Sequence, residues 1–135
     1  MQQQELVELM QAAAADAVSY SAEQFEHQLD FSLGSLALVD DILSKLHQQQ
    51  LSNAFSTEML FTLSNIFGAY LGQIFIQQIG GHWHNNQLEQ AAPYVAVQLA
   101  DKEFPFASVC YHKLTQDNNI SVQQYLQLAK ANAMQ

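Results

Sequence analysis

Arginine is absent from this chain of 135 residues, which has only four lysines against thirteen aspartates and glutamates. The formal net charge is -9 with histidine neutral. A nucleic-acid-binding surface depends on clustered cations that neutralise phosphates. This composition therefore predicts that neither DNA nor RNA is a partner.

Cysteine is nearly absent too, because Cys110 is the only one and no disulfide can form within the chain. Residues 1–5 lack the basic and apolar regions that begin a secretory signal. Both features are typical of a protein in a reducing compartment, and we expect a cytoplasmic location.

Catalytic motifs are missing as well. The chain has no glycine-flanked nucleophile elbow and no phosphate-cradling loop of the Walker or dinucleotide type. Cys110 and His112 are two positions apart, and such residues point in different directions on a helix. We therefore favour a protein without enzymatic activity, and we expect no catalytic residues and no cofactor.

Charge is also missing from Met59 to Ile79, a stretch of 21 residues that is long enough to cross a bilayer as a helix. Amide side chains interrupt the stretch, and no lysine or arginine flanks it as an anchor. We expect a central, largely buried helix and no membrane as a partner.

The chain does contain enough apolar material for one core. Hydrophobic residues make up 49% of the sequence and aromatic residues 10%. A chain of this length and composition fits one domain that folds alone, so we assign residues 1–135 to a single domain.

Helical periodicity marks the first part of the chain. Apolar residues recur at helical spacing from Glu5 to about Tyr20. Ser21 then either starts a second short helix through Leu29 or lies within a continuation of the first.

Two further helices follow. Ser32 is the expected N-cap of the first, which ends in a polar loop at residues 47–50. Ser56 is the expected N-cap of a long helix over residues 57–79, and Gly80-Gly81 ends it. The buried stripe expected on the first of these helices is Leu36, Val39, Leu43 and Leu46.

Beyond the two glycines the apolar period changes to two. Residues 82–86 and 94–99 read as short strands, and Asp101 and Lys102 supply a polar turn after them.

Helical spacing returns after Pro105, and Ser121 is the expected N-cap of a last helix. The whole pattern predicts an α+β fold. We expect N-terminal helices and a long central helix packed on a small antiparallel sheet, followed by C-terminal helices.

His82 and His84 lie on one face of the first predicted strand, with Trp83 on the other. Two imidazoles can contribute to a metal site, but zinc sites usually take three or four protein ligands, and the spacing dictates no third. We favour a polar strand edge and expect no metal.

Gly68 and Gly72 lie four residues apart on the long helix and would leave a smooth groove on it. Tight packing against a neighbouring element is the interpretation we favour. Tyr70 and Gln73 of the same helix remain able to reach a pocket.

The net charge is concentrated at the N-terminal end. Residues 1–60 hold nine acids and one lysine, whereas residues 61–135 hold four acids and three lysines. If the first helices bury their apolar stripes, their carboxylates form an anionic surface that attracts a basic partner. An acidic face that serves only solubility is the alternative. The expected partner-binding residues are Glu5, Glu8, Asp16, Glu23, Glu26 and Asp41.

The chain resembles a group of small uncharacterised bacterial proteins in a combination of short motifs. These are Asp30-Phe31-Ser32 with Ser35-Leu36 and Val39-Asp40, then Gly68-Ala69-Tyr70-Leu71-Gly72, and then Gly80-Gly81-His82-Trp83. The resemblance covers residues 29–115 and implies a single α+β domain. Some similar small acidic proteins act as immunity factors against bacterial toxins. Where that pattern commonly has an acidic residue after the second glycine of the helix, this chain has Gln73.

Two hypotheses about function follow. The first is a non-enzymatic acidic binding protein, such as a bacterial immunity or inhibitor protein, that binds a basic protein such as a toxin. The alternative is a domain that binds a small ligand or a metal, with or without enzymatic activity, in a pocket between the central helix and the sheet. An oligomeric structural protein is a third possibility, and the oligomeric state stays open. The expected lining of the alternative pocket is Tyr70, Gln73, His82 and His84.

Overall fold

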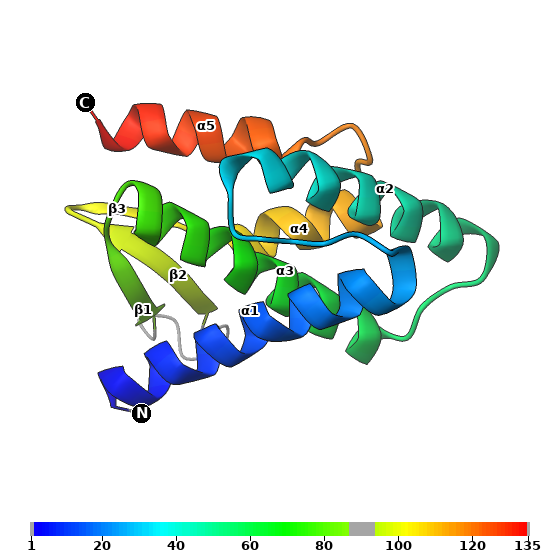
Figure 1. Cartoon of the computed structure of the whole chain (residues 1–135), viewed down its shortest axis with the longest axis horizontal. Helices are drawn as coiled ribbons and strands as arrows, with labels where there is room; N and C mark the ends of the chain where they lie inside the picture. Colours follow the sequence, from blue (N-terminus) through cyan, green and yellow to red (C-terminus); the bar gives the residue numbers. More distant parts are fainter. Residues whose placement is uncertain (1, 87–93, 135) are drawn as a thin grey trace.

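The computed structural model describes residues 2–86 and 94–134 and shows an α+β fold, in which a small antiparallel sheet follows the N-terminal helices along the chain and lies at one end of the fold (Figure 1). A short 3-10 helix, η1 (Leu33–Ser35), leads into the second helix. The predicted fold class and order of elements are confirmed. The remaining elements are α1 (Gln3–Phe25), α2 (Leu36–Ser52), α3 (Thr57–Gln78), β1 (His82–Asn86), β2 (Tyr94–Leu99), β3 (Lys102–Phe104), α4 (Phe106–Thr115) and α5 (Val122–Ala133).

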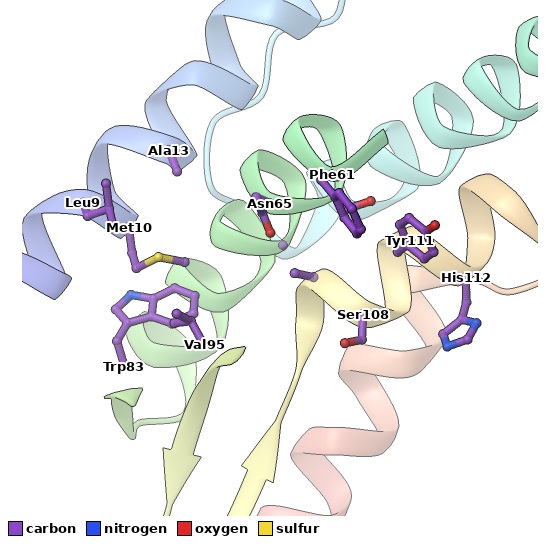
Figure 2. A pocket seen from close by; sticks show the side chains of 13 residues that line it. Leu9, Met10, Ala13, Phe61, Asn65, Trp83, Val95, Ser108, Tyr111 and His112 are labelled. Carbon is purple, nitrogen blue, oxygen red and sulfur yellow. The ribbon is translucent and has the colours of Figure 1, made fainter. Parts of the chain in front are cut away.

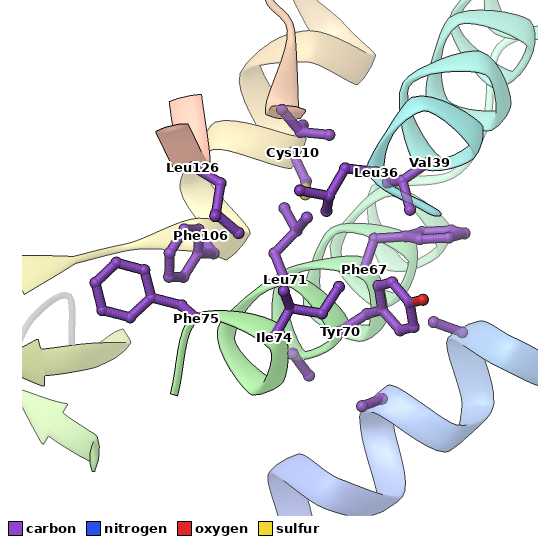
Figure 3. Packing of buried hydrophobic residues seen from close by; sticks show 14 of the residues in the cluster. Leu36, Val39, Phe67, Tyr70, Leu71, Ile74, Phe75, Phe106, Cys110 and Leu126 are labelled. Atoms are coloured by element: carbon purple, nitrogen blue, oxygen red, sulfur yellow. The ribbon is translucent and has the colours of Figure 1, made fainter. Parts of the chain in front are cut away.

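Helix α3 lies at the centre of the fold, and its most extensive contacts are with α4 and α1. Phe67, Leu71 and Ile74 of α3 belong to the same buried cluster as Leu36 of α2 and Cys110 of α4, part of which Figure 3 shows. By length and composition alone α3 could cross a membrane, and 61% of its most apolar stretch is buried inside the fold.

The sheet has the strand order β1-β2-β3, with both pairs antiparallel. Trp83 lies opposite Val97, which in turn lies opposite Phe104, and all three are buried. Because side chains alternate along a strand, His82 and His84 lie on the other face of the sheet. The predicted strand at residues 82–86 and its alternation are confirmed.

The predicted helix boundaries are confirmed where one side chain or one backbone conformation fixes them. Ser32, Ser56 and Ser121 each accept a hydrogen bond from the amide three residues later, at 3.1 Å in every case. Gly80 and Gly81, which follow α3, have φ angles of 136° and 94°. L-residues rarely adopt such angles, so glycine is needed there.

The first helix continues through Phe25, so the short helix from Ser21 to Leu29 does not form. Ser21 is buried inside α1, and its carbonyl oxygen accepts the amide of Glu26. Glu26 has a φ of 57° and ends the helix there.

Helix α2 also runs further than expected, to Ser52, and the predicted loop at residues 47–50 is wrong. His47 donates through Nδ1 to the Leu114 carbonyl oxygen at 2.8 Å, and Gln50 Nε2 donates to the same oxygen at 3.0 Å. These polar side chains pack against the end of α4, which keeps their own backbone helical.

The predicted polar turn after residues 94–99 is displaced by one residue, and a third strand follows it. Ala100, with a φ of 57°, and Asp101 form this turn, and Lys102 already belongs to β3.

Candidate functional site

Five carboxylates of the expected partner surface belong to α1 or to its C-cap, and all five are exposed. Glu5, Asp16 and Glu23 follow one another after eleven and seven residues, close to three and two helical turns, so they share one face. These three residues, the acidic row, span roughly 27 Å at the rise of a helix. Glu8 flanks the row, and Glu26 lies just beyond its end.

The lysines of the chain all belong to elements other than α1. Lys45 lies on α2, Lys113 is buried on α4, Lys102 is in β3, and Lys130 is on α5. Within residues 2–86 and 94–134, no ion pair joins a lysine to the row. The negative charge of this face is therefore not neutralised by lysines of the described fold.

Asp41, the sixth expected residue, is a correction to that surface because it is already paired. Its Oδ2 lies 2.9 Å from Lys45 Nζ and 2.9 Å from His27 Nε2. Hydrogen bonds from Lys45 and His27 lower the pKa of the Asp41 carboxyl. The neighbouring Asp40 also acts inside the fold, accepting from the Val122 amide at 2.6 Å at the start of α5.

An apolar groove of about 610 Å³ lies beside α1 (Figure 2). Helices α1, α3 and α4 supply most of its lining, and β1 and β2 contribute one residue each. We call it the α1–α4 groove. Its lining residues are Leu9, Met10, Ala13, Phe61, Ser64, Asn65, Gly68, Trp83, Val95, Ala107, Ser108, Tyr111 and His112.

Small residues let α3 and α4 approach closely in the lining of this groove. A Cβ atom at Gly68 would lie 2.5 Å from the Cα of Ala107, so only glycine fits there. A Cβ atom at Gly72 would lie 2.1 Å from the Trp83 ring. Both glycines therefore allow close internal packing, which is the interpretation that the sequence pattern favours for them.

Large side chains form the walls of the groove. Phe61 and Tyr111 stack with their ring centroids 5.3 Å apart and their planes at 16°. Trp83 donates through Nε1 to Gln73 Oε1 at 2.7 Å, which fixes the indole ring. Figure 2 shows Met10 pointing toward that ring.

The acidic row borders this groove directly. Leu9 follows Glu5 by four residues and Asp16 follows Ala13 by three, so each pair lies side by side on α1. Leu9, which lines the groove, has an exposed fraction of 52%. The surface thus combines an apolar groove with an anionic border.

The four residues of the alternative pocket do not line this groove, and the structure places them in three different settings. Tyr70 is fully buried, and its hydroxyl accepts the Phe31 amide at 2.8 Å and lies 2.7 Å from Ser35 Oγ. Burial raises the pKa of that hydroxyl above its ordinary value.

Gln73, the second of these residues, already accepts the hydrogen bond from the Trp83 indole through its side-chain oxygen. His82 and His84 lie on the sheet face opposite Trp83, and His84 Nε2 is 3.8 Å from Glu103 Oε1. The expectation of a pocket near the central helix and the sheet therefore has to be corrected in its residues, because helix and strand geometry turn these side chains away from the groove.

The described residues offer little catalytic chemistry. Cys110 is completely buried, and burial, helped by the nearby Asp40, raises the pKa of its thiol, which disfavours the reactive thiolate. No group of three or more His, Cys, Asp or Glu residues that could hold a metal ion occurs in the described ranges.

Sequence reasoning missed most of the groove. Phe61 and Asn65 lie within a long apolar helix, where nothing in the sequence separates wall residues from core residues. Leu9 could have been recognised as a surface residue of the groove, because it falls on the flank of the apolar stripe of α1.

No protein-family model matches the chain, and comparisons with curated proteins and with solved structures find no significant match. The resemblance to small bacterial proteins therefore stays a prediction from sequence motifs.

Proposed function

We propose that this protein is a non-enzymatic acidic binding protein that engages a basic protein, as an inhibitor or an immunity protein does. The observation that carries the proposal is the acidic row on α1. Its carboxylates are exposed, and no lysine of the described residues pairs with them.

The charge acts mainly on the rate of encounter. A face of one sign attracts oppositely charged partners and repels acidic competitors, and salt weakens this attraction. Charge alone does not set affinity, so a partner also needs apolar contact. The α1–α4 groove beside the row offers such contact.

The test compares two charge reversals that change the net charge equally. Asp16→Lys changes the acidic row, and Asp101→Lys changes the exposed turn between β2 and β3. For a basic protein captured from the source cells, we expect Asp16→Lys to slow association with the purified protein about tenfold at low salt. Asp101→Lys should change it less than about twofold.

The captured protein counts as a partner only if its association with the wild type also slows as salt rises. Equal association rates for Asp16→Lys, Asp101→Lys and the wild type would refute the proposal. So would a partner that is itself acidic.

A small apolar ligand is the second candidate, and the volume of the groove favours it. About 610 Å³ falls in the range of roughly 300–1,000 Å³ that is typical of small-molecule pockets. Native mass spectrometry of the purified protein tests this candidate directly. A bound mass that disappears in a Phe61→Asp variant would promote it, and an unliganded mass would refute it.

A further inference from the structure

We infer that the α1–α4 groove receives the apolar face of an amphipathic helix from a basic partner, with lysines or arginines of that helix beside the acidic row. This inference rests on the proposed function and adds how the partner is held. The shape, the exposed apolar surface and the charge of the groove each support it.

The groove has the shape of a socket for side chains. Ala13, Gly68 and Ala107 are small, whereas Trp83 and Tyr111 are bulky. A volume of about 610 Å³ corresponds to about twenty water molecules at roughly 30 Å³ each. Displacing water from mostly apolar walls favours the binding of large aliphatic or aromatic side chains.

The walls expose apolar surface that the described fold leaves uncovered. Leu9 of α1 and Phe61 of α3 both line the groove, and each has an exposed fraction of 52%. The Phe61–Tyr111 stack and the hydrogen bond from Trp83 to Gln73 hold the aromatic walls in place before binding. A socket that is already ordered costs less conformational entropy when a partner enters.

The geometry favours a helix over an added β-strand. Strand addition needs free backbone groups on the edge strand β1. The Trp83 carbonyl oxygen on β1 already accepts Gln3 Nε2 at 2.8 Å, so the helix α1 covers that edge. The lining comes mainly from three helices, an arrangement that accepts the side chains of a further helix.

The negative charge beside the groove favours a basic partner over an acidic one. Glu5 lies beside Leu9, and Asp16 beside Ala13, so cations that flank an apolar helix face would meet carboxylates. Among the described residues that line the groove there is no lysine, and His112 is the only basic one. A second copy of this chain would bring another acidic row against the first, so a basic partner is the favoured occupant.

The experiment uses Trp83, the only tryptophan, as its reporter. The probe is a synthetic helical peptide with leucine and phenylalanine on one face and lysine on the other. One control peptide has the same composition in a scrambled order, and a second has glutamate in place of lysine. We expect the amphipathic lysine peptide to change the Trp83 emission in a saturable way and to bind at least about tenfold more tightly than either control.

Substitutions in the groove distinguish its contribution to peptide binding from that of the acidic row. Leu9→Asp and Phe61→Asp each place a charge in the groove, and Leu128→Asp is the matched control on α5, where Leu128 has an exposed fraction of 58%. All three add a negative charge, which by electrostatics alone would strengthen binding of the lysine peptide. We expect the two groove variants instead to weaken it about tenfold, and the control to stay within about twofold of the wild type. Circular dichroism verifies folding, and Leu9→Asp still decides if Phe61→Asp misfolds.

The outcomes distinguish the inference from the proposed function. If Asp16→Lys weakens binding but the groove variants behave like Leu128→Asp, the inference is overturned and the proposed function stands. If the groove variants weaken binding but the glutamate peptide binds equally well, both the basic partner and the proposed function are overturned. Binding of no peptide, a co-purified small molecule that blocks the peptide, or a dimer that the groove variants dissociate would each overturn the inference.

Discussion

The contact between α3 and α4 at Gly68 gives the sharpest prediction about stability. A Cβ atom placed on Gly68 would lie 2.5 Å from Ala107 Cα, 2.6 Å from Ala107 N and 2.8 Å from Ala107 Cβ. Favourable contacts between carbon atoms lie near 3.5–4.0 Å, so the Gly68→Ala variant requires a separation of about 1 Å. The obstructing atoms include backbone, and helix α4 itself has to move.

The magnitude follows from two opposing effects. Overpacking a core usually costs about 1–3 kcal/mol, and moving a helix places this site at the upper end. Alanine is more favourable than glycine inside a helix by about 1 kcal/mol. We therefore expect Gly68→Ala to lower the free energy of unfolding by about 2 kcal/mol, which corresponds to a fall in Tm of roughly 8 °C for a domain of this size.

Urea denaturation followed by Trp83 fluorescence and by circular dichroism measures this change. Gly34→Ala is the matched control, because the nearest atom to its added Cβ would be Ser32 Oγ at an ordinary 3.7 Å. We expect the control to change stability by no more than about 0.5 kcal/mol. If Gly68→Ala is as stable as the wild type, α3 and α4 do not meet as closely as described.

Three further predictions concern buried or paired groups. Tyr70→Phe removes the hydroxyl bonded to Ser35 and should lower the free energy of unfolding by about 1–3 kcal/mol in thermal denaturation; an unchanged Tm would contradict this. Cys110 is fully buried, so a thiol reagent should label it only as fast as the native protein opens; rapid labelling without denaturant would show that the site is open. For Asp41 the folded pKa is lowered by Lys45, so the stabilisation is present above the ordinary value of 3.8 and is lost as pH falls through the folded pKa. Because this side chain is 45% exposed, Asp41→Asn should cost less than about 1 kcal/mol near pH 7, and this cost should shrink as the pH falls through the folded pKa; a cost that does not change with pH would exclude the ion pair as its cause.

Local chemistry made the fold class and several boundaries predictable from sequence. The N-caps Ser32, Ser56 and Ser121 each act on an amide three residues away, and Gly80-Gly81 end α3 through backbone conformations of their own. Such features depend on neighbours in the sequence. For the same reason the exposed acidic row could be expected from the apolar stripe of α1.

Contacts between distant residues were not predictable in the same way. His47 is held by Leu114, 67 residues away, and this contact extends α2 beyond its polar residues. Tyr70 is bonded to Ser35, which removes it from any pocket. The pairing of Asp41 with Lys45 did carry a local signal, because oppositely charged residues four apart on a helix are neighbours.

The groove itself required the three-dimensional arrangement. Its lining joins residues from Leu9 to His112, and no spacing in the sequence brings α1, α3 and α4 together. The sequence predicts a pocket near the central helix, but it does not indicate on which side of that helix the pocket lies.

The proposed binding face combines the acidic row and the α1–α4 groove to receive a basic, amphipathic partner. Stopped-flow fluorescence of Trp83 with the lysine peptide, over a series of salt concentrations, tests this proposal. The association rate of the wild type and of Asp101→Lys should fall steeply and in parallel as salt rises, whereas the rate of Asp16→Lys should start lower and fall less. An association rate that is independent of salt, or the same for Asp16→Lys and Asp101→Lys, would show that the acidic row does not attract the basic peptide.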